Sequence, residues 1–126
     1  MALGRAIEVN EAFRTLKDPV RRAEALLARR GVQSGEGKEP PASPALLMEV
    51  MERREALAEI RQSKNEAALS RLIAEVRAID ARTQLALTAE FAQATPSSAE
   101  ILKRIGELRY YRRFLDEASA IADEVL

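Results

Sequence analysis

Residues 44–62 read PALLMEVMERREALAEIRQ, and this stretch decides the fold that the sequence predicts. Its apolar side chains recur every three or four residues, which is the spacing of one face of an α-helix. Ser43 and Pro44 stand at its start, where a capping hydroxyl followed by proline favours a first helical turn. We therefore predict an amphipathic helix over residues 44–62. Four side chains within roughly 80° of one another on its helical wheel form the predicted core stripe: Leu46, Val50, Leu57 and Ile60.

Two longer helices with the same apolar spacing are predicted over residues 64–94 and 96–126. A capping box at residues 63–66 predicts the first start, and Thr95 followed by Pro96 predicts the second. Ala, Leu, Glu and Arg dominate the chain, and these residue types favour helices. Because the connections are short, consecutive helices are expected to lie antiparallel. The sequence therefore predicts an all-α fold with a C-terminal antiparallel three-helix bundle.

Two shorter helices are predicted upstream of the bundle. Residues 2–16 form the first, with an apolar face, and residues 19–30 form the second, which ends at Gly31. The segment that follows is rich in glycine and proline, which predicts a linker. The predicted division of the chain has three parts: residues 1–31 as two N-terminal helices, 32–43 as a linker and 44–126 as the bundle.

Composition excludes several classes of function. The 126 residues include 20 basic and 20 acidic side chains but no histidine and no cysteine. These absences exclude a Ser-His-Asp triad, a cysteine nucleophile and metal or cluster binding through histidine or cysteine ligands. Balanced charge gives no basic footprint for a nucleic acid, and no apolar run is long enough to span a membrane. We therefore expect no cofactor, no metal, no nucleic-acid partner and no membrane partner.

The apolar arc of helix 44–62 is wider than one core stripe needs. Leu47 and Met51 lie at the edge of the stripe, and Met48 lies beyond them in an acidic row formed by Glu52, Glu55 and Glu59. One interpretation is a solvated helix face, with Met48 covering a gap. The other is a docking face, in which flexible Met and Leu side chains fill a partner's pocket and carboxylates select a basic partner.

The last predicted helix carries aromatic and basic side chains beside its core stripe. Tyr110 and Phe114 either widen the core or extend the apolar patch of helix 44–62. Arg109 and Arg112 are expected to be solvated, or paired with Glu107 and Asp116 at helical spacing. An all-helical mutase would need arginines that face inward, and the predicted core positions are apolar. We therefore expect no enzyme, with a structural helical adaptor or an oligomerisation module as the main alternative to a docking module.

Three segments resemble one known family, the HscB-type co-chaperones of iron–sulfur cluster assembly. VNEAFRTLKDPVRRAEALLARRG, at residues 9–31, is similar to the end of the J domain in that family. ALLMEVMERREALAEI, at residues 45–60, resembles the segment that opens its C-terminal domain. ELRYYRRFLDEA, at residues 107–118, is similar to its final helix. The resemblance covers nearly the whole chain in the family's order.

The resemblance implies a function and a set of partners. The C-terminal bundle of the family binds the cluster scaffold protein (IscU-type), and its J domain stimulates a specialised heat-shock ATPase (HscA-type). Residues 1–31 would then be the remnant of the J domain. An aromatic contact in the last helix matches either Tyr110 or Phe114, and we favour Phe114. The other positions that match the family's scaffold-docking residues lie in helix 44–62: Leu47, Met48, Met51, Glu52, Glu55 and Glu59.

One departure from the family pattern is decisive for the predicted activity. A J domain needs a His-Pro-Asp loop to activate its chaperone, and this chain has no histidine. We expect the chain to be a fragment that binds scaffold without stimulating the ATPase. The apolar face of residues 2–16, which would pack against the missing helices, is expected to pair with another copy or to fold onto the bundle. The N-terminus carries no targeting signal, and we expect a cytoplasmic protein.

Overall fold

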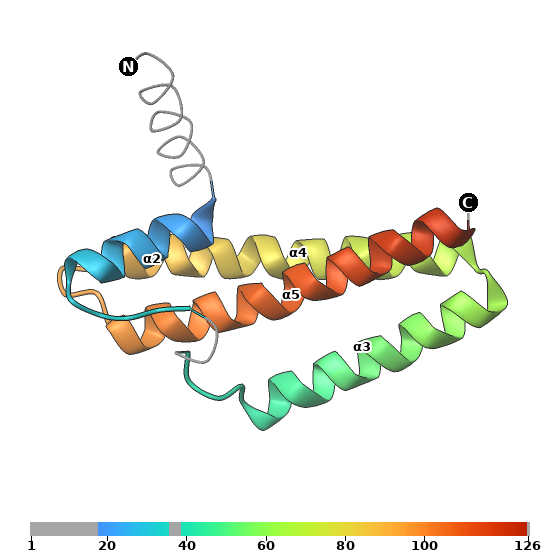
Figure 1. The fold of residues 1–126 in the computed structure, drawn as a ribbon, viewed down its shortest axis with the longest axis horizontal. Coiled ribbons are helices and arrows are strands. Elements are labelled where there is room, and N and C mark those ends of the chain that lie inside the picture. Colours follow the sequence, from blue (N-terminus) through green and yellow to red (C-terminus); the bar gives the residue numbers. More distant parts are fainter. Residues whose placement is uncertain (1–17, 36–38, 126) are drawn as a thin grey trace, which may run out of the picture.

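The computed structural model describes residues 18–35 and 39–125, and Figure 1 shows their arrangement. These residues form four α-helices and no strand, which confirms the predicted all-α fold. The helix predicted over residues 2–16 lies outside the described residues. In chain order the helices are α2 (Pro19–Arg29), α3 (Pro44–Ser63), α4 (Glu66–Phe91) and α5 (Ser98–Val125).

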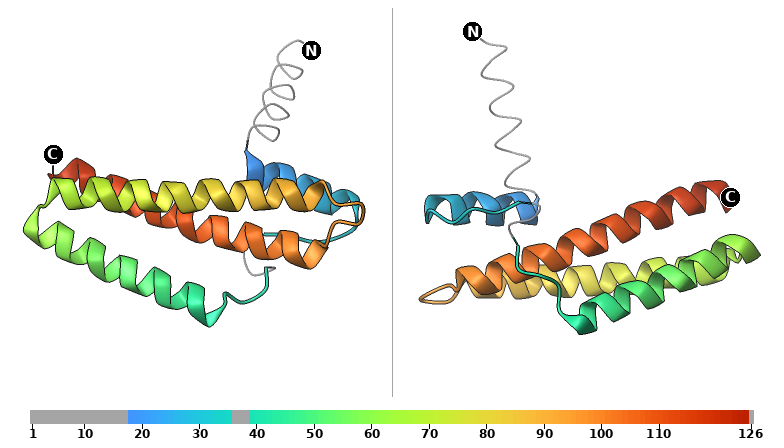
Figure 2. Two further views of the ribbon diagram at one scale, coloured as in Figure 1. Left: turned by 180° about the vertical axis from the view of Figure 1, so that it is seen from behind. Right: turned by 60° about the horizontal axis from the view of Figure 1, so that its bottom comes forward.

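The three long helices run antiparallel in sequence order and form the bundle. In Figure 1, α4 and α5 lie side by side over most of their length, and α3 lies along them on one side. The views in Figure 2 show α2 beside the first turns of α5, at the end of the bundle that carries the α4–α5 turn. The predicted antiparallel three-helix bundle is therefore present.

Helix α5 is the central helix, because it is covered on two sides. Ile101, Ile105 and Leu108 of α5 are completely buried. Arg109 and Arg112, which follow on the same helix, form ion pairs with α2 and the linker, while the opposite flank of α5 packs against α3 and α4. Helix α2 adds three buried side chains to the same core: Val20, Ala23 and Leu27. The N-terminal part of the described chain therefore shares one core with the bundle.

Thr83 is the only buried polar residue in the described part of the chain. Its hydroxyl donates a hydrogen bond of 2.9 Å to the carbonyl oxygen of Ile79, one turn earlier on α4. This bond satisfies the donor inside the helix, which removes most of the cost of burying a hydroxyl. The remaining core is aliphatic, with Tyr111 and Phe114 as its buried aromatic residues.

Two helix starts lie two residues later than the sequence predicts. Lys64 adopts a left-handed conformation (φ 55°) that ends α3, so the N-cap of α4 is Asn65, whose side chain accepts from the backbone N–H of Ala68. At the next start, Ser97 replaces Thr95 as the cap, and its hydroxyl accepts from the N–H of Glu100. Both corrections leave the predicted helices in place.

The end of α2 agrees with the prediction. Gly31 has a φ of 74°, the left-handed conformation that favours glycine after a helix. The N–H of Val32 then donates to the carbonyl oxygen of Leu27, and that of Gly31 to Ala28. These are the two hydrogen bonds of a Schellman motif, and they satisfy carbonyls that the helix end would leave unpaired.

Candidate partner-docking face on helix α3

Ion pairs fix the orientation of α3 on the bundle. On one side, Arg53 lies 3.7 Å from Glu75 of α4. On the other side, Arg54 and Arg61 reach α5: Arg54 lies 3.3 Å from Glu117, and Arg61 lies 3.0 Å from Glu124. These pairs flank the buried stripe of Leu46, Leu57 and Ile60, which faces the core. The outer side of α3 is therefore left without a partner among the described helices.

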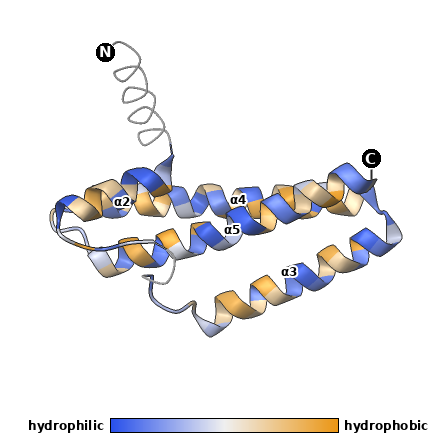
Figure 3. Cartoon of the chain, in the orientation of Figure 1, coloured by the Kyte–Doolittle hydropathy of each residue, from blue (hydrophilic) through white to orange (hydrophobic). Residues whose placement is uncertain are grey.

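Three large apolar side chains lie on that outer side. Leu47 is 44% exposed, and Met48 and Met51 are each 62% exposed. The predicted core position Val50, in contrast, is half-buried against the cluster. Figure 3 shows hydrophobic colouring concentrated in the first turns of α3. The side chains that the sequence set apart from the core stripe are thus available to another molecule.

The acidic row continues the same surface toward the end of α3. Glu52, Glu55 and Glu59 are exposed, and none of them forms an ion pair with another described residue. On a helical wheel the row and the apolar side chains share one arc of roughly 140°. We call this surface the docking face and define it by six residues: Leu47, Met48, Met51, Glu52, Glu55 and Glu59.

The two candidate aromatic residues of α5 have different surroundings. Phe114 is only 5% exposed and belongs to the core, whereas Tyr110 is half-buried at the surface. The preference for Phe114 as a surface contact is therefore corrected, because its ring is already covered by the bundle. The ring of Tyr110 is also held on one side by Arg113, whose guanidinium carbon lies 5.7 Å from the ring centroid.

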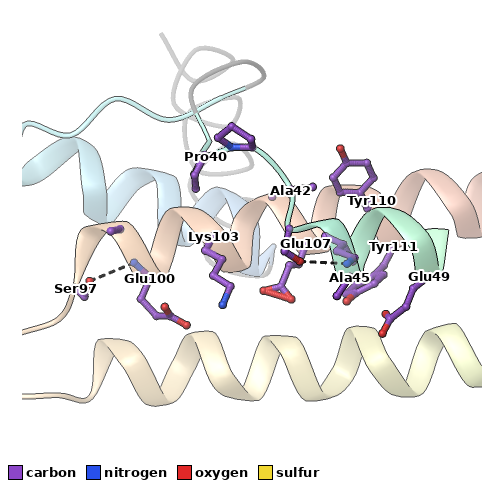
Figure 4. Close-up of a pocket in the computed structure, with 15 residues that line it drawn as sticks. Pro40, Ala42, Ala45, Glu49, Ser97, Glu100, Lys103, Glu107, Tyr110 and Tyr111 are labelled. Atoms are coloured by element: carbon purple, nitrogen blue, oxygen red, sulfur yellow. Dashed lines mark hydrogen bonds between the residues drawn. The ribbon is translucent and has the colours of Figure 1, made fainter. Parts of the chain in front are cut away.

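A hollow of about 500 Å³ lies where the linker, the start of α3 and α5 meet. Figure 4 shows Tyr110 at its rim, with Glu49, Lys103 and Glu107 along its wall. Tyr111 lies deeper, and burial followed by the charge of Glu107 raises the pKa of its phenol, despite an opposing hydrogen bond with Thr83. The hollow therefore lies between Tyr110 and the first turn of α3, and its α3 lining residues are Ala45, Leu46 and Glu49.

Local spacing led to the wrong partners for two arginines of α5. Arg109 forms ion pairs with Glu24 of α2 and Glu39 of the linker, which helical spacing on α5 did not indicate. Arg112 lies 3.0 Å from Asp18, the N-cap of α2. These partners are 70 to 94 residues away along the chain, so helical spacing could not identify them. Together the pairs hold α2 and the linker on α5.

The described residues offer little for catalysis. No group of three or more acidic side chains in the described ranges is arranged to hold a metal ion. The arginines that approach the interior, Arg53 and Arg109, are engaged in ion pairs between elements. Among the described helices, none combines the length and the apolar character needed to cross a bilayer.

Comparisons with known proteins agree with this architecture. Residues 42–119 match the family model described as the HSCB C-terminal oligomerisation domain. The chain is 32% identical to a co-chaperone protein HscB homolog of Vibrio cholerae, over all of this chain and 73% of that protein. A homolog from Shewanella baltica is 35% identical, over all of this chain and 74% of the relative. A shorter match, to a homolog from Burkholderia multivorans, is 43% identical over 61% of this chain and 44% of the relative.

A solved structure gives the same result for the fold. The chaperone HscB from Vibrio cholerae superimposes with a TM-score of 0.82 at 32% identity, covering all of this chain and 72% of the other. The match extends over α2 as well as the bundle, since it spans the full chain. Family model, sequence relatives and structure therefore agree, and the chain belongs to the HscB family of co-chaperones.

Proposed function

We propose that this chain is a non-enzymatic co-chaperone module of iron–sulfur cluster assembly, and that it binds the cluster scaffold protein through the docking face on α3. The observation that carries the proposal is the exposure of Leu47, Met48 and Met51 beside an acidic row without internal partners. The iron–sulfur cluster is cargo on the scaffold, because this chain has no cysteine or histidine to ligate it.

The chemistry of the docking face indicates the kind of partner it accepts. Exposed methionines adapt their shape to a partner's apolar pocket, and burying two of them yields much of an interface's affinity. The carboxylates of Glu52, Glu55 and Glu59 attract a partner surface that carries Lys or Arg. A scaffold with an apolar pocket and a basic rim satisfies both requirements.

Tyr110 extends the proposed contact from α3 to α5. Its half-buried ring is positioned by Arg113 and by the hollow beside the start of α3. A rigid aromatic side chain at the edge of a flexible methionine patch gives orientation to the complex at low entropic cost. We propose that the scaffold contacts both helices.

The proposed delivery of the scaffold to a heat-shock-type ATPase depends on a His-Pro-Asp loop. This chain has no histidine and therefore does not carry that loop. The expected behaviour is binding of the scaffold without stimulation of the ATPase. Helix α2 resembles the last helix of the J domain. It shares a core with α5, and we propose that this packing joins the J-domain segment to the scaffold-binding bundle.

Calorimetric titration of a purified iron–sulfur scaffold protein tests the proposal. Met51→Ala is expected to weaken binding about 5- to 30-fold, which corresponds to about 1–2 kcal/mol for truncating an interface anchor. Leu85→Ala is the matched control, because Leu85 is 70% exposed but lies on α4. It should leave the affinity unchanged.

The possible outcomes separate the candidate functions. Saturable binding that is weakened by Met51→Ala and not by Leu85→Ala supports the docking function. Failure of a folded chain to bind any scaffold protein would contradict it and favour the structural adaptor. Circular dichroism measures the helicity of Met51→Ala. A large loss of helicity would show that Met51 is a core residue and would also overturn the proposal.

A further inference from the structure

A hollow of about 470 Å³ lies between α2 and α4 and shares no residue with the docking face. Leu85 of α4 forms part of its wall and is 70% exposed, the most exposed large apolar side chain in the described part of the chain. A single exposed leucine is ordinary on a protein surface, but this one borders a concave site. We call this site the α2–α4 groove and define it by its six lining residues: Pro19, Arg22, Ala81, Gln84, Leu85 and Thr88.

Two arginines border the groove without an ion-pair partner among the described residues. Arg22 of α2 lines the groove directly. Arg77 lies one turn before Ala81 on α4 and within about 40° of it on the helical wheel, so it extends the same flank of the helix. Both arginines are exposed, and neither is among the described residues that form ion pairs. Their guanidinium groups are therefore available to a partner.

The carboxylates nearest to the groove along the chain are already engaged. Asp18, the N-cap of α2, lies 3.0 Å from Arg112 of α5. On α4, Oδ2 of Asp80 accepts a hydrogen bond of 2.5 Å from Nε2 of Gln84, and Oδ1 of the same carboxylate is buried. The two arginines are therefore the charges that the groove presents to another molecule.

We infer that the α2–α4 groove binds an acidic peptide segment of another protein. In this arrangement a leucine or phenylalanine side chain of the segment packs against Leu85, and flanking carboxylates pair with Arg22 and Arg77. Charge complementarity sets the occupant, since two unpaired cations border an apolar centre. The planar guanidinium group also suits carboxylates, which it can bind through two parallel hydrogen bonds.

Other occupants fit the groove less well. Residues 1–17, which lead directly into Pro19, carry three basic and two acidic side chains, so charge does not favour them as the occupant. A nucleic acid is held mainly through several phosphates, and it would leave the apolar centre of the groove without a matching group. An acidic segment with one large apolar side chain satisfies both parts of the site.

The groove and the docking face lie on different sides of the molecule. Figures 1 and 2 show α2 and α3 on opposite sides of the α4–α5 pair. An acidic segment in the groove therefore leaves the outer side of α3 free, and the chain can hold that partner and the scaffold at the same time. Joint occupancy rests on the proposed function, whereas binding of the acidic segment does not.

A nuclear magnetic resonance titration of the full chain with a synthetic peptide tests the inference. The probe has a leucine–phenylalanine pair between two runs of glutamate. Signals of Ala81, Leu85 and Thr88 are expected to shift, and binding should be about tenfold weaker at 0.5 M than at 0.05 M salt, because salt screens exposed charges. A peptide with lysine in place of glutamate should not bind. A peptide with alanine in place of the apolar pair should bind at least about fivefold more weakly.

Two matched double variants show whether the position of the charge matters. Arg22→Glu with Arg77→Glu reverses the border of the groove and should weaken peptide binding at least about tenfold. Arg71→Glu with Arg82→Glu changes the net charge equally, but both positions lie more than about 100° from Arg77 on the helical wheel. This control should change the affinity less than about twofold. All four side chains are exposed, so circular dichroism should show wild-type helicity in both variants.

Several results would overturn the inference. Equal weakening by both double variants would show that net charge alone attracts the peptide. Shifts centred on α3 or α5, or no shifts at all, would place the peptide elsewhere or nowhere. A short RNA oligonucleotide is the rival probe, and tighter binding of the RNA than of the acidic peptide would make the surface a phosphate-binding site.

Titration of scaffold onto the peptide-saturated chain separates this inference from the proposed function. The scaffold affinity should be the same with and without peptide. If the peptide binds in the groove and no scaffold binds with or without it, the proposed function fails and the groove stands. If scaffold binds and the peptide does not, the groove fails and the proposed function stands. Displacement of the peptide by scaffold would contradict joint occupancy.

Discussion

The guanidinium of Arg109 donates from Nε to Oε1 of Glu39 at 2.7 Å, and this bond fixes the linker on α5. The Glu39 side chain is only 8% exposed, so Arg109 supplies the contact that offsets the loss of water around this carboxylate. The same guanidinium also reaches Glu24 of α2 at 3.1 Å. One side chain of the central helix therefore holds both the linker and α2.

Removal of the Arg109 side chain should loosen the linker. Arg109→Ala leaves the shielded carboxylate of Glu39 without its cation, and we expect a loss of about 1–3 kcal/mol in the free energy of unfolding. Urea denaturation measures this change. The double variant Arg109→Ala with Glu39→Ala should lose less than the sum of the two single variants, and strict additivity would contradict the coupling.

Asp18 should contribute stability that depends on pH. Burial pushes the pKa of its carboxyl upward, but hydrogen bonds from the Arg21 N–H and from Arg112 outweigh it and lower the pKa overall. A lowered pKa means that the stabilisation is present above the unfolded value of about 3.9 and is lost as pH falls through the folded value. We expect less than about 1 kcal/mol from the charge, because the pair is partly exposed.

Two variants of Asp18 separate the charge from the helix cap. Asp18→Asn keeps a capping oxygen and should lose only the pH-dependent part, so its stability should approach that of the wild type in acid. Asp18→Ala also loses the cap and should be about 1 kcal/mol less stable still. Urea titrations at neutral and acidic pH measure both differences. A gap between the wild type and Asp18→Asn that widens in acid would show the opposite sign.

Tyr110 and Phe114 should respond differently to truncation, although they are four residues apart on α5. Phe114→Ala opens a cavity in the core, and we expect a loss of about 3–5 kcal/mol in unfolding free energy. Tyr110→Ala should cost much less stability and should weaken scaffold binding. Thermal unfolding and titration of both variants provide the comparison. If Phe114→Ala is as stable as the wild type, the assignment of the Phe114 ring to the core is wrong.

Charge reversal at Glu52 should act on the rate of docking more than on the fold. Glu52→Lys is expected to slow association with the scaffold and to reduce its dependence on salt, because an exposed carboxylate steers a basic partner. Stopped-flow kinetics at several salt concentrations measures both effects. Asp123→Lys changes the net charge equally at the exposed end of α5 and should have little influence. Equal effects of both variants would indicate net charge, and not the docking face, as the cause.

The periodic part of the fold could be predicted from the sequence. The buried stripe of α3 and the exposure of Met48 and Met51 follow from helical spacing, which is a local property. Phe114 and Tyr110 differ by only about 40° on the wheel. On the helical wheel of α5, Phe114 lies at the edge of the buried arc and Tyr110 lies just outside it. The width of that arc depends on how α3 and α4 pack against α5, and helical spacing alone does not give it.

The contacts between distant segments could not be predicted. Arg112 and Asp18 are 94 residues apart, and Arg109 and Glu39 are 70 residues apart. The capping residues of α4 and α5 were also missed by two positions, because Ser63 and Thr95, which are equally good caps by type, stand two residues before the true caps, Asn65 and Ser97. The exposure of Leu85 is consistent with spacing, since Leu85 lies about 200° on the wheel from the buried Thr83 and Leu87.

The most direct test of the central claim is a nuclear magnetic resonance titration of the isotope-labelled chain with unlabelled scaffold protein. Signals of α3 residues 47–59 and of Tyr110 are predicted to shift or broaden, while those around Leu85 on α4 stay unchanged. Perturbations centred on α4 or α2, with the signals of Met48 and Met51 unchanged, would contradict the assignment of the docking face.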